Sequence, residues 1–102
     1  MQNIEIKLPT TATFSSIEKA IEATIVAQGL EIALRGTLKK FPGCLHWHVR
    51  SPGQTGTLEL TLWPQQHRAW ITIQSGRAAA WISKSLPEVQ TTLYQHLADR
   101  TN

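Results

Sequence analysis

The chain has 102 residues, of which 41% are hydrophobic and 17% charged, a length and balance that favour one packed domain over disorder. Its formal net charge is +3, and its single cysteine excludes an internal disulfide and a cysteine-built zinc site. No stretch approaches the roughly 18 apolar residues of a membrane span, and the first residues do not resemble a signal peptide. We therefore expect one domain over residues 1–102, located in the cytoplasm.

The first part of the chain predicts a strand and a helix. Apolar and polar residues alternate over Asn3–Leu8, which is typical of a half-buried strand. The segment Ser15–Glu18 has the spacing of a capping box, in which the first and last side chains each bond the other's backbone N–H. Three isoleucines then follow at four-residue spacing, as on the buried side of a helix. They are Ile17, Ile21 and Ile25.

A second helix is predicted between Gly29 and Gly43. Apolar residues recur there at helical spacing, and two lysines followed by phenylalanine, proline and glycine are typical of a helix end. Because the spacing shifts after Gly29, we expect a break between the two helices. The segment Glu31–Arg35 also alternates as a strand does, and the pattern leaves that alternative open.

The middle of the chain predicts three antiparallel strands. Apolar and polar residues alternate over 45–50, 57–63 and 68–74, and short segments rich in turn formers separate them. If the apolar side chains share one face of the sheet, Trp47 lies opposite Leu60, and Leu60 lies opposite Ile71. A one-residue slip in a strand would move its apolar residues to the other face.

The last part of the chain predicts two further helices. A short one covers Ala78–Ser83, and Ser85–Glu88 repeats the capping-box spacing at the start of the other, with Pro87 in its first turn. The predicted fold class is therefore α+β, with a three- to four-stranded antiparallel meander and helices packed on one face. The expected order is (β)-α-α-β-β-β-α-α, with the first strand at an edge of the sheet.

The opposite face of this sheet carries an unusual set of side chains. They are His46, His48, Glu59, Trp63, Arg68 and Trp70. Cross-strand neighbours on one face can touch, and exposed tryptophans mark binding surfaces. We therefore expect a small intracellular binding or regulatory domain that needs no cofactor and is not an enzyme. Its partner through this face would be a second copy, giving a homodimer, or another protein.

Three other interpretations of this face stay open. The chain's own helices or N-terminal segment could cover it. Trp63 and Trp70 could stack on the bases of single-stranded nucleic acid while arginines contact phosphates. His46 and His48, two residues apart on a strand, point the same way, and Glu59 lies across from His48, so the three could bind zinc or iron for hydrolytic or oxidative chemistry.

Two smaller signals lie beside the predicted sheet. Ser75, Gly76 and Arg77 join a strand to a helix and could bind an anion through backbone N–H groups and the guanidinium. An ordinary helix cap is the alternative interpretation. Cys44 precedes the first central strand and is expected to be a small buried residue and not a nucleophile.

Overall fold

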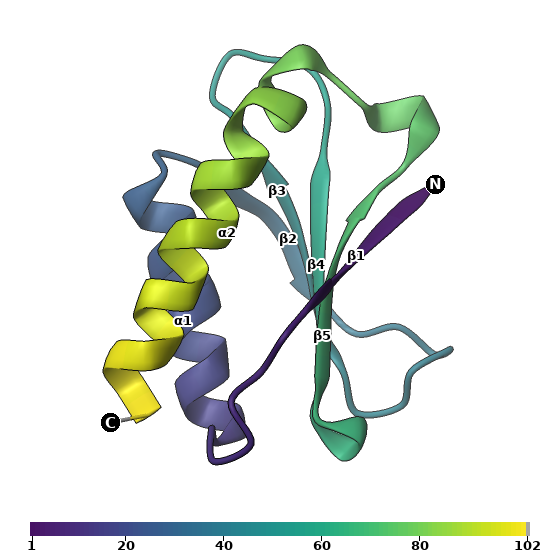
Figure 1. Cartoon of the computed structure of the whole chain (residues 1–102). Coiled ribbons are helices and arrows are strands. Elements are labelled where there is room, and N and C mark those ends of the chain that lie inside the picture. Colours follow the sequence, from purple (N-terminus) through teal and green to yellow (C-terminus); the bar gives the residue numbers. More distant parts are fainter. Residues whose placement is uncertain (102) are drawn as a thin grey trace.

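The computed structural model describes residues 1–101 and has an α+β fold (Figure 1). One antiparallel sheet has the strand order β1-β5-β4-β3-β2. The strands are β1 (Gln2–Ile6), β2 (Glu31–Gly36), β3 (Leu45–Arg50), β4 (Leu58–Trp63) and β5 (Arg68–Ile73). The helices are α1 (Phe14–Ala27) and α2 (Ala80–Thr101), and short 3-10 helices cover Pro64–Gln66 and Ser75–Arg77.

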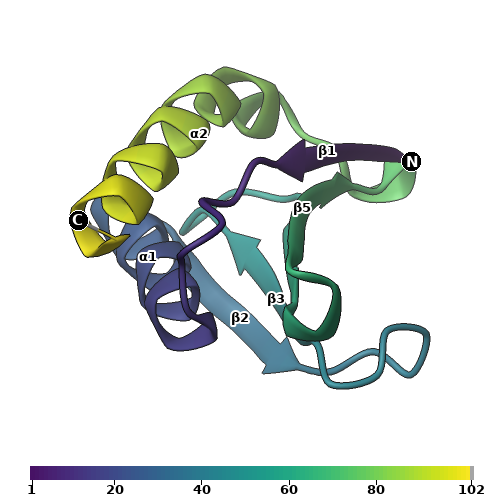
Figure 2. The same cartoon turned by 60° about the horizontal axis from the view of Figure 1, so that its bottom comes forward.

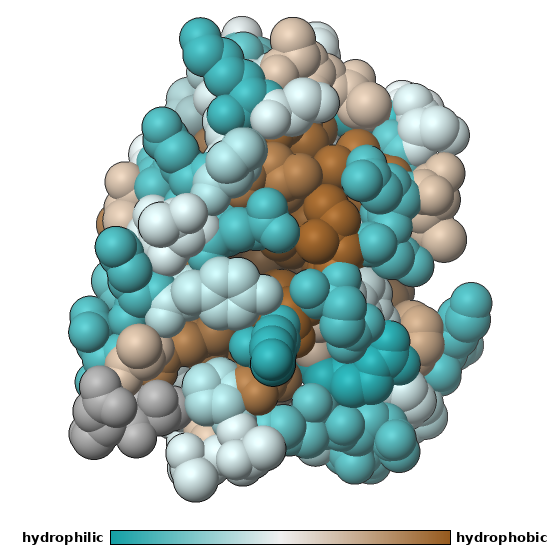
Figure 3. All heavy atoms as spheres, viewed as in Figure 1, coloured by the Kyte–Doolittle hydropathy of each residue, from teal (hydrophilic) through white to brown (hydrophobic). Residues whose placement is uncertain are grey.

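Both helices lie on one side of the sheet, and the segment between β2 and β3 lies on the other (Figures 1 and 2). The core fills the space between sheet and helices. In Figure 3 hydrophobic atoms are also visible between α2 and β1. The largest fully buried side chains of the described residues include Trp47, Ile21, Leu58, Leu62, Ile71, Ile82, Leu93 and Leu97.

The central meander confirms the predicted register. Trp47 pairs with Leu60, and Leu60 pairs with Ile71, so their side chains share the helix-covered face. The predicted edge strand is also present, since β1 pairs with β5. The sheet has five strands and not three or four, because β2 adds a strand at the opposite edge.

The helix predicted between Gly29 and Gly43 is wrong, and the strand alternative is confirmed. Gly29 has a φ of 69°, which turns the chain after α1. The segment Glu31–Gly36 then pairs with β3, with a register shift between Ile32 and Leu34. A strand here gives the exposed edge of β3 its backbone partners, and this gain depends on a distant segment that local spacing does not reveal.

Two details of the helices also differ from the sequence prediction. The capping box of α1 joins Thr13 and Ser16, whose side chains each accept the other's backbone N–H at 3.1 Å. Glu18, predicted to cap, instead forms an ion pair with Arg35.

The two predicted C-terminal helices form one helix, α2, with Pro87 inside it. Proline removes one backbone hydrogen bond, but buried residues on both sides of it hold the helix in place. Among them are Trp81, Ile82, Val89 and Leu93.

Neither helix in the described part of the chain is both long and apolar enough to cross a membrane.

Gly56, in the loop between β3 and β4, packs against the segment that leads into α2, and substitution there should destabilise the fold. Its φ is +99°, and a Cβ would lie 2.7 Å from Ala79 Cβ and 3.1 Å from the Arg77 carbonyl oxygen. Gly53 has a φ of +75° but nothing within 4 Å of a Cβ, so Gly53→Ala is the matched control. We expect Gly53→Ala to lower the free energy of unfolding by roughly 1–2 kcal/mol. Gly56→Ala should lower it by roughly 1–3 kcal/mol more, measured by urea denaturation. Equal losses would contradict the packing described here.

Candidate functional site

The segment between β2 and β3, residues 37–44, folds over the sheet face that the helices leave uncovered. The Phe41 ring lies 4.9 Å from the Trp70 ring in an edge-on arrangement and 5.1 Å from the Trp63 ring. Trp63 Nε1 donates to the Pro42 carbonyl oxygen at 3.0 Å. Trp70 is consequently only 6% exposed. The expectation of an open aromatic face is therefore wrong at Trp70, because the segment predicted to be a helix covers that ring.

Cys44 closes this covering segment, which we call the cover loop (residues 37–44). The Leu38 backbone N–H donates to Cys44 Sγ at 3.3 Å, and the cysteine is 1% exposed. The prediction of a small buried residue is thus confirmed. The contact holds the two ends of the cover loop together.

Arg68 has a structural role at the edge of the same sheet face. Its guanidinium donates to both carboxylate oxygens of Glu5 on β1, at 2.9 and 3.1 Å, and lies 4.8 Å from the Trp70 ring. The hydrogen bonds to Glu5 raise the pKa of Arg68. This side chain joins β1 to β5 and packs on a tryptophan, which leaves less of it available for a partner.

The structure brings His46, His48 and Glu59 together as the sequence predicts. His46 Nε2 lies 3.1 Å from His48 Nε2 and 3.3 Å from Glu59 Oε1, and His48 Nε2 lies 3.9 Å from the same oxygen. These three side chains are the His-His-Glu cluster, and among the described residues they form the one group of three or more His, Cys, Asp or Glu side chains with ligand atoms within 4.8 Å of one another. The His46 and Glu59 side chains are 5% and 7% exposed.

Two further side chains orient the cluster. His46 Nδ1 and Thr61 Oγ1 form a hydrogen bond of 2.8 Å across the β3–β4 pair. In the tautomer in which Nδ1 donates to the threonine hydroxyl, Nε2 of His46 is an acceptor, and this is the atom that lies next to His48 and Glu59. Arg77 Nη1 lies 3.6 Å from Glu59 Oε2, whereas both histidines pair with Oε1. Thr61 follows from the predicted register, whereas contact with Arg77 depends on the turn after β5.

Burial lowers the pKa of His46 below its usual 6.5, and the nearby His48 acts in the same direction. The Glu59 carboxylate acts in the opposite direction, but burial is the larger effect. The neutral imidazole is therefore favoured at neutral pH, and neutral imidazole is the form that binds metal ions.

Two hollows meet at the cluster. The first has a volume of about 520 Å³ and is lined by Leu38, His46, His48, Glu59, Gln74, Gly76 and Arg77. The second, of about 180 Å³, lies under the cover loop and is lined mainly by Leu38, Phe41, Trp70, His46, Glu59, Thr61 and Thr72, with Met1, Asn3, Lys40 and Gln74 completing it. We call them the arginine hollow and the ring hollow. Leu38 and Phe41 line the hollows but are not predicted by the sequence, because the spacing of the cover loop indicates a helix. Gln74 lies on this face in the predicted alternation over 68–74, as the structure has it.

The predicted anion site at Ser75, Gly76 and Arg77 forms a short 3-10 helix. The Arg77 backbone N–H donates to the Gln74 carbonyl oxygen at 3.0 Å, so this donor is already occupied. A Cβ at Gly76 would meet nothing within 4 Å. The Arg77 guanidinium lines the arginine hollow and lies 3.6 Å from the Glu59 carboxylate, while anion binding by this segment stays a prediction.

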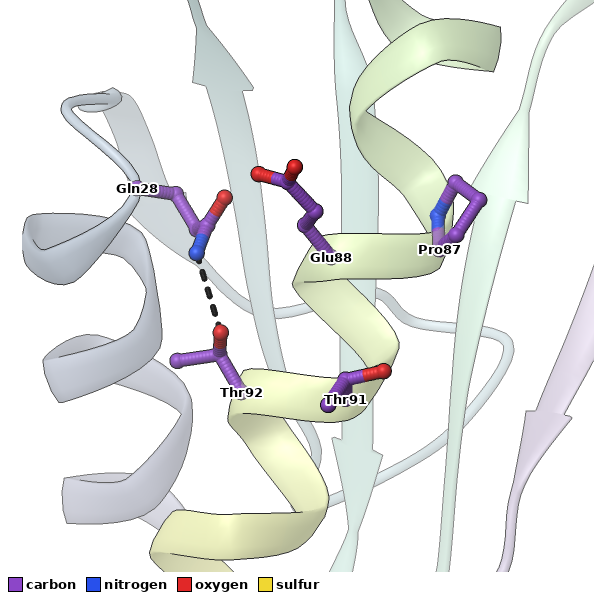
Figure 4. A pocket seen from close by; sticks show the side chains of 5 residues that line it. All are labelled: Gln28, Pro87, Glu88, Thr91 and Thr92. Atoms are coloured by element: carbon purple, nitrogen blue, oxygen red, sulfur yellow. Dashed lines mark hydrogen bonds between the residues drawn. The ribbon is translucent and has the colours of Figure 1, made fainter.

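A third hollow, of about 290 Å³, lies between the end of α1 and α2 (Figure 4). Gln28 Nε2 donates to Thr92 Oγ1 at 2.9 Å across it, and Glu88 extends toward the same gap. Pro87 and Thr91 complete its lining. It contains one ionisable side chain, so it offers far less chemistry than the His-His-Glu cluster.

Removing the ring that covers Trp70 should loosen this face. Phe41→Ala should lower the free energy of unfolding by about 2 kcal/mol, roughly half the value for a fully buried phenylalanine, because Phe41 is half-buried. It should also increase the quenching of tryptophan fluorescence by acrylamide. Phe14→Ala, at a phenylalanine that is 41% exposed, is the control and should change neither measurement as much. Unchanged quenching in Phe41→Ala would contradict the contact with Trp70.

The lowered pKa of His46 predicts a pH-dependent stability in the presence of a chelator. Between pH 6.5 and the lower pKa of the folded protein, the unfolded chain binds a proton at this residue more readily than the folded one. The free energy of unfolding should therefore fall as the pH decreases through this range. His46→Gln should make the decline shallower in urea titrations at several pH values. An unchanged slope would show that His46 is not protected from protonation.

Comparison with known proteins assigns neither a family nor a function to this chain. A scan of protein-family models, a search of curated proteins and a search of solved structures each find no match to the chain.

Proposed function

We propose that the protein is a small metal-binding domain whose working site is the His-His-Glu cluster. The observation that carries the proposal is the spacing of three donor atoms. Ligand atoms bound about 2.0–2.1 Å from a tetrahedral zinc ion lie about 3.3 Å apart. The three separations in the cluster are 3.1, 3.3 and 3.9 Å, so one ion could contact all three atoms after small side-chain rotations.

The burial of Glu59 supports the same proposal. A carboxylate that is 7% exposed needs a cation or several hydrogen bonds to offset its desolvation. The Arg77 guanidinium, at 3.6 Å from Oε2, is too far for a strong charge-assisted hydrogen bond. The other oxygen, Oε1, faces Nε2 of both histidines, and these two nitrogens form a hydrogen bond of 3.1 Å with each other when one of them carries a proton. A divalent cation between these three atoms would replace the shared proton and neutralise the buried carboxylate more fully than the imidazoles and Arg77 do.

The donor set also limits the metal and its chemistry. Two imidazoles and a carboxylate suit zinc and its first-row neighbours. Three protein ligands leave a fourth position for water or an added ligand, as in catalytic zinc sites and not in closed structural ones. The Thr61 contact to His46 Nδ1 is the kind of outer-shell hydrogen bond that fixes a metal-binding imidazole. A bound ion would there act as a Lewis acid toward the fourth ligand.

The other functions that the sequence suggests have less support. Base stacking and a dimer through the sheet face both need accessible aromatic rings, whereas Trp70 is 6% exposed and Trp63 contacts Phe41 and Pro42. Arg68 is engaged with Glu5. A regulatory or binding role for the domain is compatible with a metal site. Self-association stays a prediction, which native mass spectrometry would test in the same preparation.

Metal binding can be tested on protein prepared without a polyhistidine tag. We expect one zinc or cobalt ion per chain, measured by titration against a chromophoric chelator and by the visible absorption of tetrahedral cobalt. Loss of an outer-shell partner typically weakens metal binding 10- to 100-fold. Removal of a ligand in His48→Gln or Glu59→Gln should therefore weaken it by at least about 100-fold.

The matched control is His96→Gln, which removes a histidine of α2 that contacts Arg100 and lies outside the cluster. It should bind metal as the original chain does. Circular dichroism would show that each variant is folded. A chain that binds no stoichiometric ion, or that binds it equally well in His48→Gln, would refute the proposed site.

A further inference from the structure

The position of the two hollows beside the His-His-Glu cluster indicates what the metal would bind. We infer that the site takes a small oxyanion attached to a single apolar ring, such as an aromatic carboxylate or an aryl phosphate. This inference rests on the proposed metal site. It assigns the anionic group to the metal and Arg77, and the ring to the ring hollow.

The charges beside the cluster favour an anion. A divalent ion bound by neutral His46 and His48 and the Glu59 carboxylate would retain one positive charge, and Arg77 adds another. The Arg77 side chain is 52% exposed, and its guanidinium lines the arginine hollow. Its planar donors fit the paired oxygens of a carboxylate or phosphate. An anion in this hollow could therefore bind the metal's fourth position and the guanidinium at once.

The ring hollow lies next to this position. Leu38, His46, Glu59 and Gln74 line both hollows, so a ligand bound at the metal can extend from one hollow into the other. The volume of the ring hollow is about 180 Å³. An apolar protein cavity of about 150 Å³ can hold benzene, so one six-membered ring fits here.

The lining of the ring hollow suits an apolar group. Leu38, Phe41 and Trp70 contribute apolar surface. Its two threonines are already paired, since Thr72 Oγ1 donates to Asn3 Oδ1 at 2.7 Å and Thr61 is bonded to His46, while Lys40 and Gln74 also line it. Among the described residues no buried side-chain nitrogen or oxygen lacks a hydrogen-bond partner. A polar substituent beside the two threonines would therefore find few free partners, whereas an apolar ring would leave none of these buried groups unpaired.

Calorimetric titration of the zinc-loaded protein tests this inference. The probes are benzoate and phenyl phosphate, each compared with an anion that lacks the ring: acetate for benzoate and methyl phosphate for phenyl phosphate. Burial of a ring in a hollow of this size should improve affinity by at least about tenfold. We therefore expect benzoate to bind at least tenfold more tightly than acetate. Phenyl phosphate should likewise bind at least tenfold more tightly than methyl phosphate. Whichever pair binds more tightly identifies the preferred oxyanion.

Two variants separate the two halves of the ligand. Arg77→Met should weaken the binding of all four anions about tenfold, since it removes a charge-assisted hydrogen bond to the anion. Lys84→Met, which removes a positive charge from α2 outside both hollows, is the control and should leave the affinities unchanged. Phe41→Leu should reduce the preference for benzoate over acetate. Metal stoichiometry, measured for every variant, shows that the site itself is intact.

The outcomes distinguish this inference from the proposed function. A protein that binds zinc at the cluster but prefers neither ring-bearing anion refutes the inference and leaves the metal site standing. A zinc-loaded protein whose anion affinities are unaffected by Arg77→Met also refutes it. A protein that binds no zinc refutes the proposed function and this inference together.

Discussion

The antiparallel register of β3 and β4 is the constraint on which both the core and the site depend. Strand side chains alternate between faces, so the pairing of Trp47 with Leu60 places both on the helix-covered face. The same register sets His46 against Thr61 and His48 against Glu59 on the other face. A slip of one residue in β4 would expose its leucines and break up the cluster. Hydrophobic burial on one side of the sheet thus fixes polar geometry on the other.

The cover loop gives the second face a different character from that of an ordinary solvated sheet surface. Phe41 packs against two tryptophans, and Leu38 lines both hollows. As a result the His46 and Glu59 side chains are almost fully buried, and electrostatic interactions between them are stronger than at an open surface. The helices and the cover loop therefore have separate roles: the former hold the sheet in shape, and the latter sets the environment of its polar face.

The sequence pattern is sufficient wherever a local period and the global fold agree. The alternation of β3, β4 and β5 predicts their register, and that register by itself places His48 across from Glu59. The pattern is insufficient at residues 30–43, where helical and strand spacing coexist and the decision depends on the free edge of β3. The error extends to the site, because a helix there would not cover Trp70. Arg77 is predicted to bind an anion, but its contact with Glu59 depends on the path of the turn after β5, which spacing does not encode.

The thiol of Cys44 has a consequence for how the site can be observed. It is 1% exposed and bonded to the Leu38 backbone at the start of the cover loop. A thiol reagent can reach it only when that loop separates from the sheet, so the rate of modification reports how often the loop opens. Since the chain has one cysteine, each modification by the reagent reports one opening of the cover loop. The protein thus contains a built-in kinetic reporter in its cover loop, and a ligand that occupies the ring hollow would slow the reaction by holding the loop closed.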